Sequence, residues 1–219
     1  MKHIYKFVAV CGLLLILAAC QSKTIEGNGN ISAALYNVPY FTKVKLSGAY
    51  KSVILIGAAQ KVSIHADSNI LPYIKARVDD HTLYIYMQNG YSINPSITPE
   101  INIGVAMLEQ ISTSGSARVT VSGISAKKFV AKISGSGHFN LGGISGKADL
   151  EISGSGNIDA QHLIAASADV DISGAGNVKL HATRHPDVKI SGSGSVQYAG
   201  SPTDVTQKIT GSGSVSKLP

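Results

Sequence analysis

A short corner rich in glycine and serine recurs through the second half of the chain at a nearly constant spacing. The hydroxyl residue that opens each copy stands at Ser114, Ser134, Ser153, Ser173, Ser191 and Thr210, so the intervals are 20, 19, 20, 18 and 19 residues. A fixed period of this length is typical of a solenoid, in which each unit buries its apolar side chains only against its neighbours. The repeat therefore constrains the fold more strongly than any other feature of the sequence.

Each corner follows a stretch in which apolar and polar side chains alternate. In one copy, Ala148, Leu150 and Ile152 alternate with Asp149 and Glu151. Alternation with a period of two indicates a strand with one buried face. Parallel crossovers are almost always right-handed. The repeats therefore predict an all-β fold, a right-handed parallel β-helix with coils of about 19 residues.

The first half of the chain repeats less cleanly. The segment "IEGNGNI" at 25–31 matches the corner well, whereas "LSGAYKSV" at 46–53 and "IHADSNI" at 64–70 match it loosely. The segment "QNGYSINPSITPE" contains two prolines and predicts a loop-like insertion. We expect one β-helix domain over 25–219, with irregular coils and the insertion over 25–113 and regular repeats over 114–219.

The N-terminus has the pattern of a secretory signal peptide. Lys2 and Lys6 precede an apolar run from Phe7 to Ala19, which is shorter than the roughly 20 residues that a membrane-spanning helix needs. The run ends in Leu-Ala-Ala-Cys, which resembles the lipobox of bacterial lipoproteins. That resemblance implies a signal peptide over 1–19, acylation of Cys20 and a short tether over 20–24, the alternative being ordinary signal cleavage beside an incidental cysteine.

An acylated Cys20 predicts the location of the protein and one of its partners, the membrane. Gln21 stands where the sorting rule for bacterial lipoproteins looks for aspartate, which favours the outer membrane of the cell envelope. Cys11 lies in the signal peptide, so Cys20 is the only cysteine left after cleavage. A single cysteine excludes a disulfide framework and a cysteine-based metal site.

The charge pattern argues against a nucleic-acid ligand. Two of the 19 basic residues, Lys2 and Lys6, lie in the signal peptide, which leaves 17 basic against 13 acidic residues. The basic residues are scattered, and Lys127-Lys128 is the only adjacent pair. A nucleic-acid surface needs a concentrated basic patch.

The glycines and histidines do not form a recognisable cofactor or metal motif. The corner "GSGN" lacks the context of a dinucleotide or phosphate-binding loop, which opens a helix. His162 and His181 are one period apart and could meet in adjacent coils to share a metal, but surface positions are the favoured interpretation because no acidic or thiolate partner is evident. We expect no cofactor and no metal.

Two sets of outward residues are candidates for a functional surface. The first is an acidic ladder, because neighbouring coils should place Asp149 beside Asp169 and Glu151 beside Asp171, about 5 Å apart. Paired carboxylates support acid-base chemistry in polysaccharide lyases and hydrolases, and charge compensation by lysines is the alternative explanation.

The second candidate is aromatic. Seven of the nine tyrosines lie between Tyr36 and Tyr91. In "TLYIYM", Tyr84 and Tyr86 should point outward, and Tyr91 follows in the nearby loop. Tyrosine offers apolar area with a polar tip, so these three residues form a candidate surface for a glycan or an extended peptide. The alternative is that tyrosine favours half-buried strands for packing alone.

The pieces "ADSNI" and "VDDHTLYI", followed by the "SGSA…SGSG" series, resemble the head GIN domain family of autotransporter-like adhesins. The resemblance covers nearly the whole chain after the signal peptide. It implies a β-helical, secreted or lipid-anchored envelope protein, and it brings no catalytic residues.

We therefore expect a lipid-anchored, non-catalytic module for binding, adhesion or structure, with a glycan or a surface protein as ligand. A polysaccharide lyase or hydrolase is the first alternative. The second is a self-assembling envelope scaffold, because the last coil "ITGSGSVSKLP" shows no capping helix and would expose a sheet edge to another copy.

Overall fold

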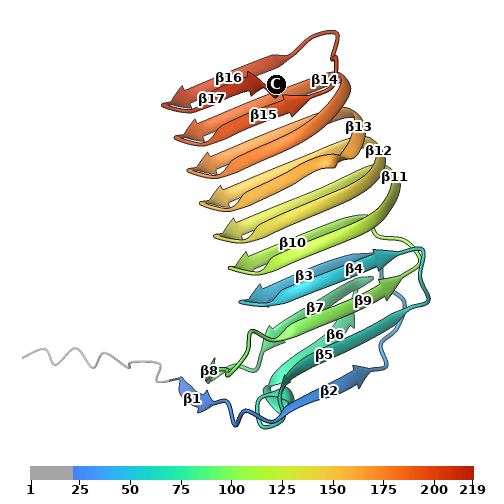
Figure 1. Cartoon of the computed structure of the whole chain (residues 1–219), viewed down its shortest axis with the longest axis vertical. Coiled ribbons are helices and arrows are strands. Elements are labelled where there is room, and N and C mark those ends of the chain that lie inside the picture. The colour runs from blue at the N-terminus through green and yellow to red at the C-terminus, as the bar shows by residue number, and fades with distance from the viewer. Residues whose placement is uncertain (1–21) are drawn as a thin grey trace, which may run out of the picture.

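The computed structural model describes residues 22–219, so the predicted signal peptide and Cys20 lie outside the described residues. The second half of the chain forms long strands joined by two-residue corners (Figure 1). No helix formed by the described residues has the length and apolar character required to cross a bilayer. The strands of this half are β10 (Gln110–Gly115), β11 (Arg118–Gly135), β12 (His138–Gly154), β13 (Asn157–Gly174), β14 (Asn177–Gly192), β15 (Ser195–Ala199), β16 (Thr206–Gly211) and β17 (Ser214–Lys217).

Each long strand makes one coil. It runs along one side of the molecule, bends, and returns along the other side to the next corner, so the corners line up in one column and the bends in another (Figure 1). Neighbouring coils pair in parallel over almost their whole length, for example from Arg118↔His138 to Gly135↔Gly154. The prediction of a β-helix of stacked parallel coils is thereby confirmed, with each coil made of one bent strand.

The inward residues of the alternation form the core. Ala148, Leu150 and Ile152 are buried, and Ile152 is flanked in register by Ile133 and Ile172 of the neighbouring coils. Such stacks bury each apolar side chain between identical or similar neighbours, so the thin core is filled without large residues. The predicted inward and outward positions of the repeats are confirmed.

The corner glycines allow the backbones of neighbouring coils to pack closely against each other. Gly154 has a φ of 127°, which side chains other than glycine rarely adopt, and a Cβ at this position would lie 2.5 Å from the carbonyl oxygen of Gly135. That same carbonyl accepts the N–H of Ser155 at 2.9 Å. The glycine pattern therefore belongs to a structural corner, in agreement with the absence of a phosphate-loop context in the sequence.

The first half of the chain contains shorter strands and antiparallel pairs. Its elements are β1 (Lys23–Glu26), β2 (Ile31–Tyr36), β3 (Lys43–Gly48), β4 (Lys51–Ile56), β5 (Lys61–Asp67), the 3-10 helix η1 (Leu71–Tyr73), β6 (Ile74–Asp79), β7 (Thr82–Met87), β8 (Tyr91–Asn94) and β9 (Glu100–Val105).

Strands β3 and β4 form a coil that stacks directly on the regular repeats. Its corner, Ser47-Gly48, pairs in register with Ser114-Gly115, so the loose corner match at 46–53 is a true corner. Beyond this coil, β7 pairs parallel to β3 and β6 pairs antiparallel to β7, while β9, β5 and β2 continue from β4 with two antiparallel pairings. The irregularity expected in the first half is therefore a set of antiparallel strands beyond the first coil.

The corner matches at 25–31 and 64–70 are wrong. Residues 27–30 form a loop beside the end of β5, and the two segments are joined by the buried carboxylate of Asp67. This carboxylate accepts the N–H of Gly29 at 2.7 Å, the N–H of Ser96 at 2.9 Å and the hydroxyl of Ser96 at 2.6 Å. The two segments that resemble corners in the sequence are instead held together by hydrogen bonds to the buried carboxylate of Asp67.

Candidate functional site

The outward side of the strands that lead into the corners forms one continuous surface. We call it the serine face: the outer side of β7, β3, β10, the second halves of β11 to β14, and β16. From β3 to β16 each of these strands ends in a corner hydroxyl residue followed by glycine. One row of side chains crosses these neighbouring strands. It consists of the residue two positions before each corner hydroxyl, together with the residue of β7 that pairs with Lys45. In order across the strands, the row is Tyr84, Lys45, Ser112, Lys132, Glu151, Asp171, Lys189 and Lys208.

This row brings the two predicted candidate surfaces together. Tyr84 of the first half and Glu151 and Asp171 of the second half lie on the same face, with β3, β10 and β11 between Tyr84 and Glu151. From the sequence alone, these residues belong to two separate candidate surfaces. The two candidate surfaces become one because β3 stacks directly on β10.

The serine face carries a hollow of about 840 Å³, which we call the axial hollow. It extends from Thr82 and Tyr84 on β7 to Asp171 and Ser173 on β13. These strands are five steps apart, so the hollow is about 24 Å long at a strand spacing of about 4.8 Å. Its depth has a simple cause, because Ser112 places a small side chain between the long side chains of Lys45 and Lys132.

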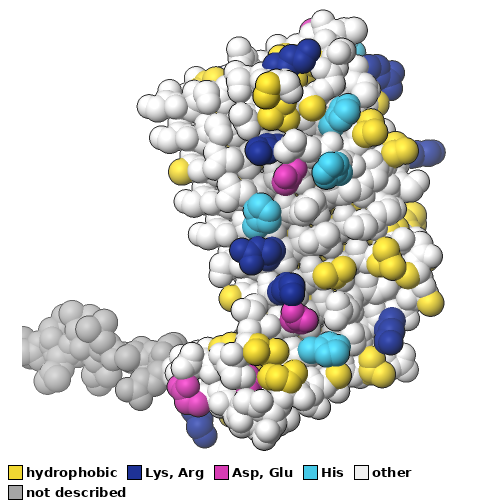
Figure 2. Space-filling model, viewed as in Figure 1, with side chains coloured by type: hydrophobic (Ala, Val, Ile, Leu, Met, Phe, Trp, Pro, Cys, Tyr) yellow, Lys and Arg dark blue, Asp and Glu magenta, His cyan; other side chains and the backbone are white. Residues whose placement is uncertain are grey.

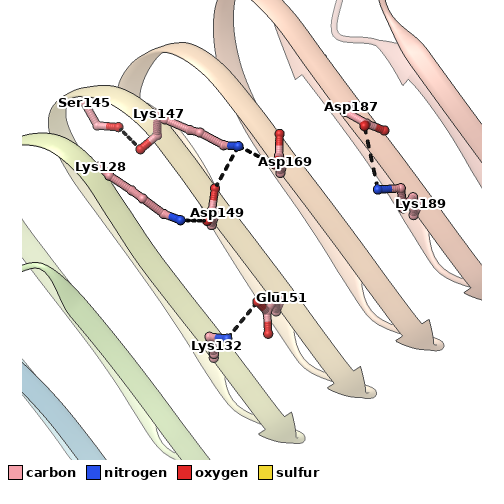
Figure 3. A network of polar contacts seen from close by, with 9 residues as sticks. All are labelled: Lys128, Lys132, Ser145, Lys147, Asp149, Glu151, Asp169, Asp187 and Lys189. Atoms are coloured by element: carbon pink, nitrogen blue, oxygen red, sulfur yellow. Dashed lines mark hydrogen bonds and ion pairs between the residues drawn. The ribbon is translucent and has the colours of Figure 1, made fainter.

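The acidic ladder stacks in the predicted register. Asp149 pairs with Asp169, and Glu151 pairs with Asp171. Lysines lie beside three of these four carboxylates (Figure 3): the Nζ atoms of Lys128, Lys132 and Lys147 are 2.5 Å from Asp149, 2.8 Å from Glu151 and 2.5 Å from Asp169, respectively. The ladder is therefore largely charge-compensated, as the alternative explanation held.

Lys147 is the centre of the compensating network. Its Nζ also lies 3.7 Å from Asp149, so it bridges two coils (Figure 3). The hydrogen bond with Asp169 raises the pKa of Lys147 above its usual value, and burial opposes the shift. Within residues 22–219, no cluster of three or more histidine, cysteine, aspartate or glutamate side chains is arranged to hold a metal ion.

The three predicted tyrosines do not form one platform. Tyr84 and Tyr86 lie on the outer side of β7, as predicted, and both line a second hollow of about 590 Å³ together with Lys45 and Arg77. The guanidinium carbon of Arg77 lies 4.9 Å from the centre of the Tyr84 ring. Tyr91 instead packs against Tyr73, with ring centres 4.6 Å apart, and lines neither of these hollows.

Two lysines at the junction of the halves were missed by the sequence analysis. Lys43 and Lys45 line the axial hollow, and neither has an acidic group within 4.0 Å among the described residues. Their signal was the alternation in "FTKVKLSG", which points both side chains outward beside buried Val44 and Leu46. Aligning this corner with the later ones places Lys45 in the row of Lys132.

His162 and His181 do not pair with each other across neighbouring coils. Figure 2 shows one face of the molecule, on which histidine, basic and acidic side chains are scattered over several coils. His162 pairs in register with Gly142, whereas His181 pairs with Ile164 because the register shifts between β13 and β14. The possibility that His162 and His181 face each other one period apart is wrong.

Comparison with known proteins gives a family match and a set of similar folds. The family described as "Putative auto-transporter adhesin, head GIN domain" matches residues 40–202. No curated protein matches the sequence of this chain.

Three solved structures have a similar fold. A putative adhesin from Bacteroides fragilis is 22% identical with a TM-score of 0.73, and the match covers 89% of this chain and 100% of that one. A putative lipid binding protein from Parabacteroides distasonis is 22% identical with a TM-score of 0.56, over 90% and 100% of the two chains. A putative adhesin from Parabacteroides merdae is 18% identical with a TM-score of 0.58, again over 90% and 100%. At these identities the likeness concerns the fold alone.

Proposed function

The chain belongs to the family described as "Putative auto-transporter adhesin, head GIN domain", and from this premise we propose that it is a non-catalytic binding module of the bacterial cell envelope. Its ligand, a glycan or an extended segment of a surface protein, lies on the serine face. The family description supports an adhesin-like role, and the name of the Bacteroides fragilis protein agrees with it.

One observation carries the proposal: the axial hollow runs along a stacked sheet and has an aromatic side chain at one end. Ligand sites are concave, largely pre-formed and combine apolar surface with a few polar groups. Here Tyr84 supplies the apolar surface, and Lys45, Ser112 and Lys132 supply polar groups on a rigid scaffold. A rigid surface loses little conformational entropy when it binds.

The test of this surface is a double substitution. We expect Tyr84→Ala with Tyr86→Ala to weaken binding to a panel of envelope and host-type glycans at least about tenfold, because aromatic truncations at a contact surface are among the costliest. Tyr40→Ala is the matched control, since Tyr40 is 51% exposed and lines neither hollow. Glycan binding that survives the double substitution would reject this surface.

The anchor is the second part of the proposal. Acylation of Cys20 would hold the domain close to the membrane, most simply the outer membrane, because only four residues separate Cys20 from Ile25. A myristoyl-sized chain alone binds membranes weakly, whereas several acyl chains anchor stably. Mass spectrometry should find an acylated N-terminal Cys20, and Cys20→Ser should release the protein from the membrane fraction. An unmodified N-terminus elsewhere would refute the anchor.

Catalysis on the acidic ladder is the rival function. A retaining glycosidase needs two carboxyl groups about 5 Å apart with one held protonated, and Glu151 and Asp171 have a suitable spacing as neighbours in register. Lys132 lies 2.8 Å from Glu151, however, so this carboxylate is already ion-paired. We expect no turnover of acidic polysaccharides. Release of reducing or unsaturated ends that disappears in Glu151→Ala would establish the enzyme instead.

Self-association through a sheet edge stays a prediction. In the part of the chain that the structure describes, β16 pairs only with β14 and β17 only with β15. Ile209 of β16 is 37% exposed, although its counterparts in earlier coils are buried. Light scattering over a range of protein concentrations tests this idea, and a mass that stays monomeric throughout removes it.

A further inference from the structure

We infer that the ligand of the axial hollow is an acidic glycan, whose anionic group lies at the end of the hollow formed by β3 and β10. The inference deepens the proposed function and rests on it. It begins with the uneven charge of the hollow, whose lining contains Lys43, Lys45 and Lys132 toward the first half and Glu151 and Asp171 toward the second.

The charges in the middle of the hollow cancel. The Nζ atom of Lys132 lies 2.8 Å from a carboxylate oxygen of Glu151, and both side chains are about half exposed. A ligand must therefore compete with an existing ion pair at this point. The ion pair therefore presents hydrogen-bonding groups with no net charge to the ligand, and not a free charge.

The uncompensated positive charge lies at one end. Lys43 and Lys45 are two residues apart on β3, so their side chains leave the same side of the strand about 7 Å apart. Among the described residues, neither ammonium group is within 4.0 Å of an acidic side chain. On the neighbouring strand, Gln110 pairs in register with Lys43 and lines the same hollow, and its side-chain amide has no hydrogen-bond partner among those residues.

These three side chains suit a carboxylate, sulfate or phosphate group. Two ammonium groups supply charge, and an amide N–H₂ supplies a further donor toward the same place. Neither Glu109 nor another acidic residue lines this part of the axial hollow. Glu109 instead lines a neighbouring hollow that Lys43 and Gln110 also line, where its carboxylate accepts the hydroxyl of Thr42 at 3.0 Å.

The remaining lining matches an extended sugar chain better than a lipid surface. Ser114, Ser134, Ser153 and Ser173 follow one another along the hollow at the strand spacing. Hydroxyls at regular intervals can bond to the hydroxyls of successive sugars, and Tyr84 offers the part of its ring that Arg77 does not cover at the basic end. A membrane presents a broad surface, which contacts the rim of an elongated hollow and not its floor.

The experiment compares two short glycans that share a backbone and differ in charge, oligogalacturonate and its methyl ester, with a heparin-derived oligosaccharide as a sulfated probe. Wild-type protein should bind at least one of the acidic probes, and binding should weaken as the salt concentration rises from about 50 to about 200 mM. If oligogalacturonate is the acidic probe that binds, its methyl ester should bind at least about tenfold more weakly. The ester has no carboxylate to pair with the ammonium groups.

The variant Lys43→Gln with Lys45→Gln should lose at least about tenfold in affinity for the bound acidic probe. Lys179→Gln with Lys217→Gln is the matched control, because it removes the same net charge and both lysines lie outside the axial hollow, on strand segments that are not part of the serine face. The control should stay within about twofold of wild type. Asp171→Asn should tighten binding, since it removes a repelling carboxylate from the far end. All variants should keep the thermal unfolding profile of the wild type.

Several outcomes would overturn the inference. It fails if neither acidic probe binds wild-type protein up to about 1 mM, or if both lysine double variants weaken binding equally. It also fails if anionic phosphatidylglycerol vesicles bind in a Lys43- and Lys45-dependent manner and no acidic probe does. If uncharged glycans bind through Tyr84 and Tyr86 independently of the lysines, the inference fails while the proposed function stands. If no glycan binds at all, the inference fails and the proposed function keeps only a segment of a surface protein as its ligand.

Discussion

The two halves of the molecule build the same face in different ways. In the second half, one corner and one alternation recur, so every coil repeats the contacts of the coil before it. In the first half, β7 and β3 extend that face as parallel strands, while antiparallel strands such as β6 and β5 occur only once. The repeats supply a long, regular scaffold, and the non-repeating strands supply Tyr84, Lys43 and Lys45 at its end.

This difference teaches where to look for function in a repetitive fold. Residues that recur in every coil are required by the stacking, as the corner glycines are. A residue that occurs once on a recurring surface is free of that requirement. Ser112 is an example, because it replaces the charged residue of its row with a small one and thereby opens the axial hollow.

The largest expected effect concerns the corners of the regular half. We expect Gly154→Ala to lower the free energy of unfolding by about 3 kcal/mol, because the new Cβ meets a backbone oxygen and the φ of 127° disfavours a side chain. Gly29→Ala in the first half is the control: its φ is 74°, no atom lies within 4 Å of the added Cβ, and the cost should be about 1 kcal/mol. Urea unfolding measures both, and equal losses would contradict the stacking argument.

A smaller effect is expected from Asp67, which holds the loops of the first half together. The hydroxyl of Ser96, followed by the N–H groups of Ser96 and Gly29, lowers the pKa of Asp67 in the folded state, and burial opposes this shift. A lowered pKa stabilises the fold at pH values above the ordinary aspartate pKa of about 3.9, and this contribution disappears as the pH falls through the folded-state value.

Asp67→Asn should therefore lower the Tm at neutral pH and narrow the difference from wild type under acidic conditions. Asp80→Asn is the control, because that side chain is 92% exposed. The measurement is thermal unfolding from pH 7 down to about pH 3. A Tm difference that stays constant over this range would show that the ionised carboxylate is not the source of the stability.

The smallest effect is expected from the ion pair of the regular half. The side chains of Lys132 and Glu151 are 43% and 48% exposed, so solvent screens their attraction. Lys132→Gln should change the free energy of unfolding by no more than about 0.5 kcal/mol, and the change should shrink at high salt. A double-mutant cycle with Glu151→Gln isolates the pair. A coupling above about 2 kcal/mol would mean that the pair is far better shielded from water than its exposure indicates.

The repeat predicted the regular half in detail. Spacing and alternation alone placed Leu150 inside and Glu151 outside. The acidic ladder was predicted in register for the same reason. Residues one period apart become neighbours in space, because each coil adds one strand to the stack.

The candidate site was predicted only in parts. Tyr84, Tyr86 and the carboxylates were recognised, but Tyr91 was grouped with them on sequence proximity and in fact packs on Tyr73. Lys43 and Lys45 were overlooked because scattered lysines look alike in a sequence. A missing ion-pair partner is a property of the folded surface, and it separates these two from Lys128, Lys132 and Lys147.

The sequence by itself determined the strand alternation, the corner glycines and the stacking of the second half, because these depend on residue type and local spacing. Only the tertiary structure decided that β3 lies against β10, which are more than sixty residues apart in the chain. The strands between them in the chain pair beyond β3 and β4, so that they extend the stack and do not separate β3 from β10. Pairing between distant strands that each occur only once leaves no periodic pattern in the sequence. The axial hollow extends across the place where β3 and β10 meet.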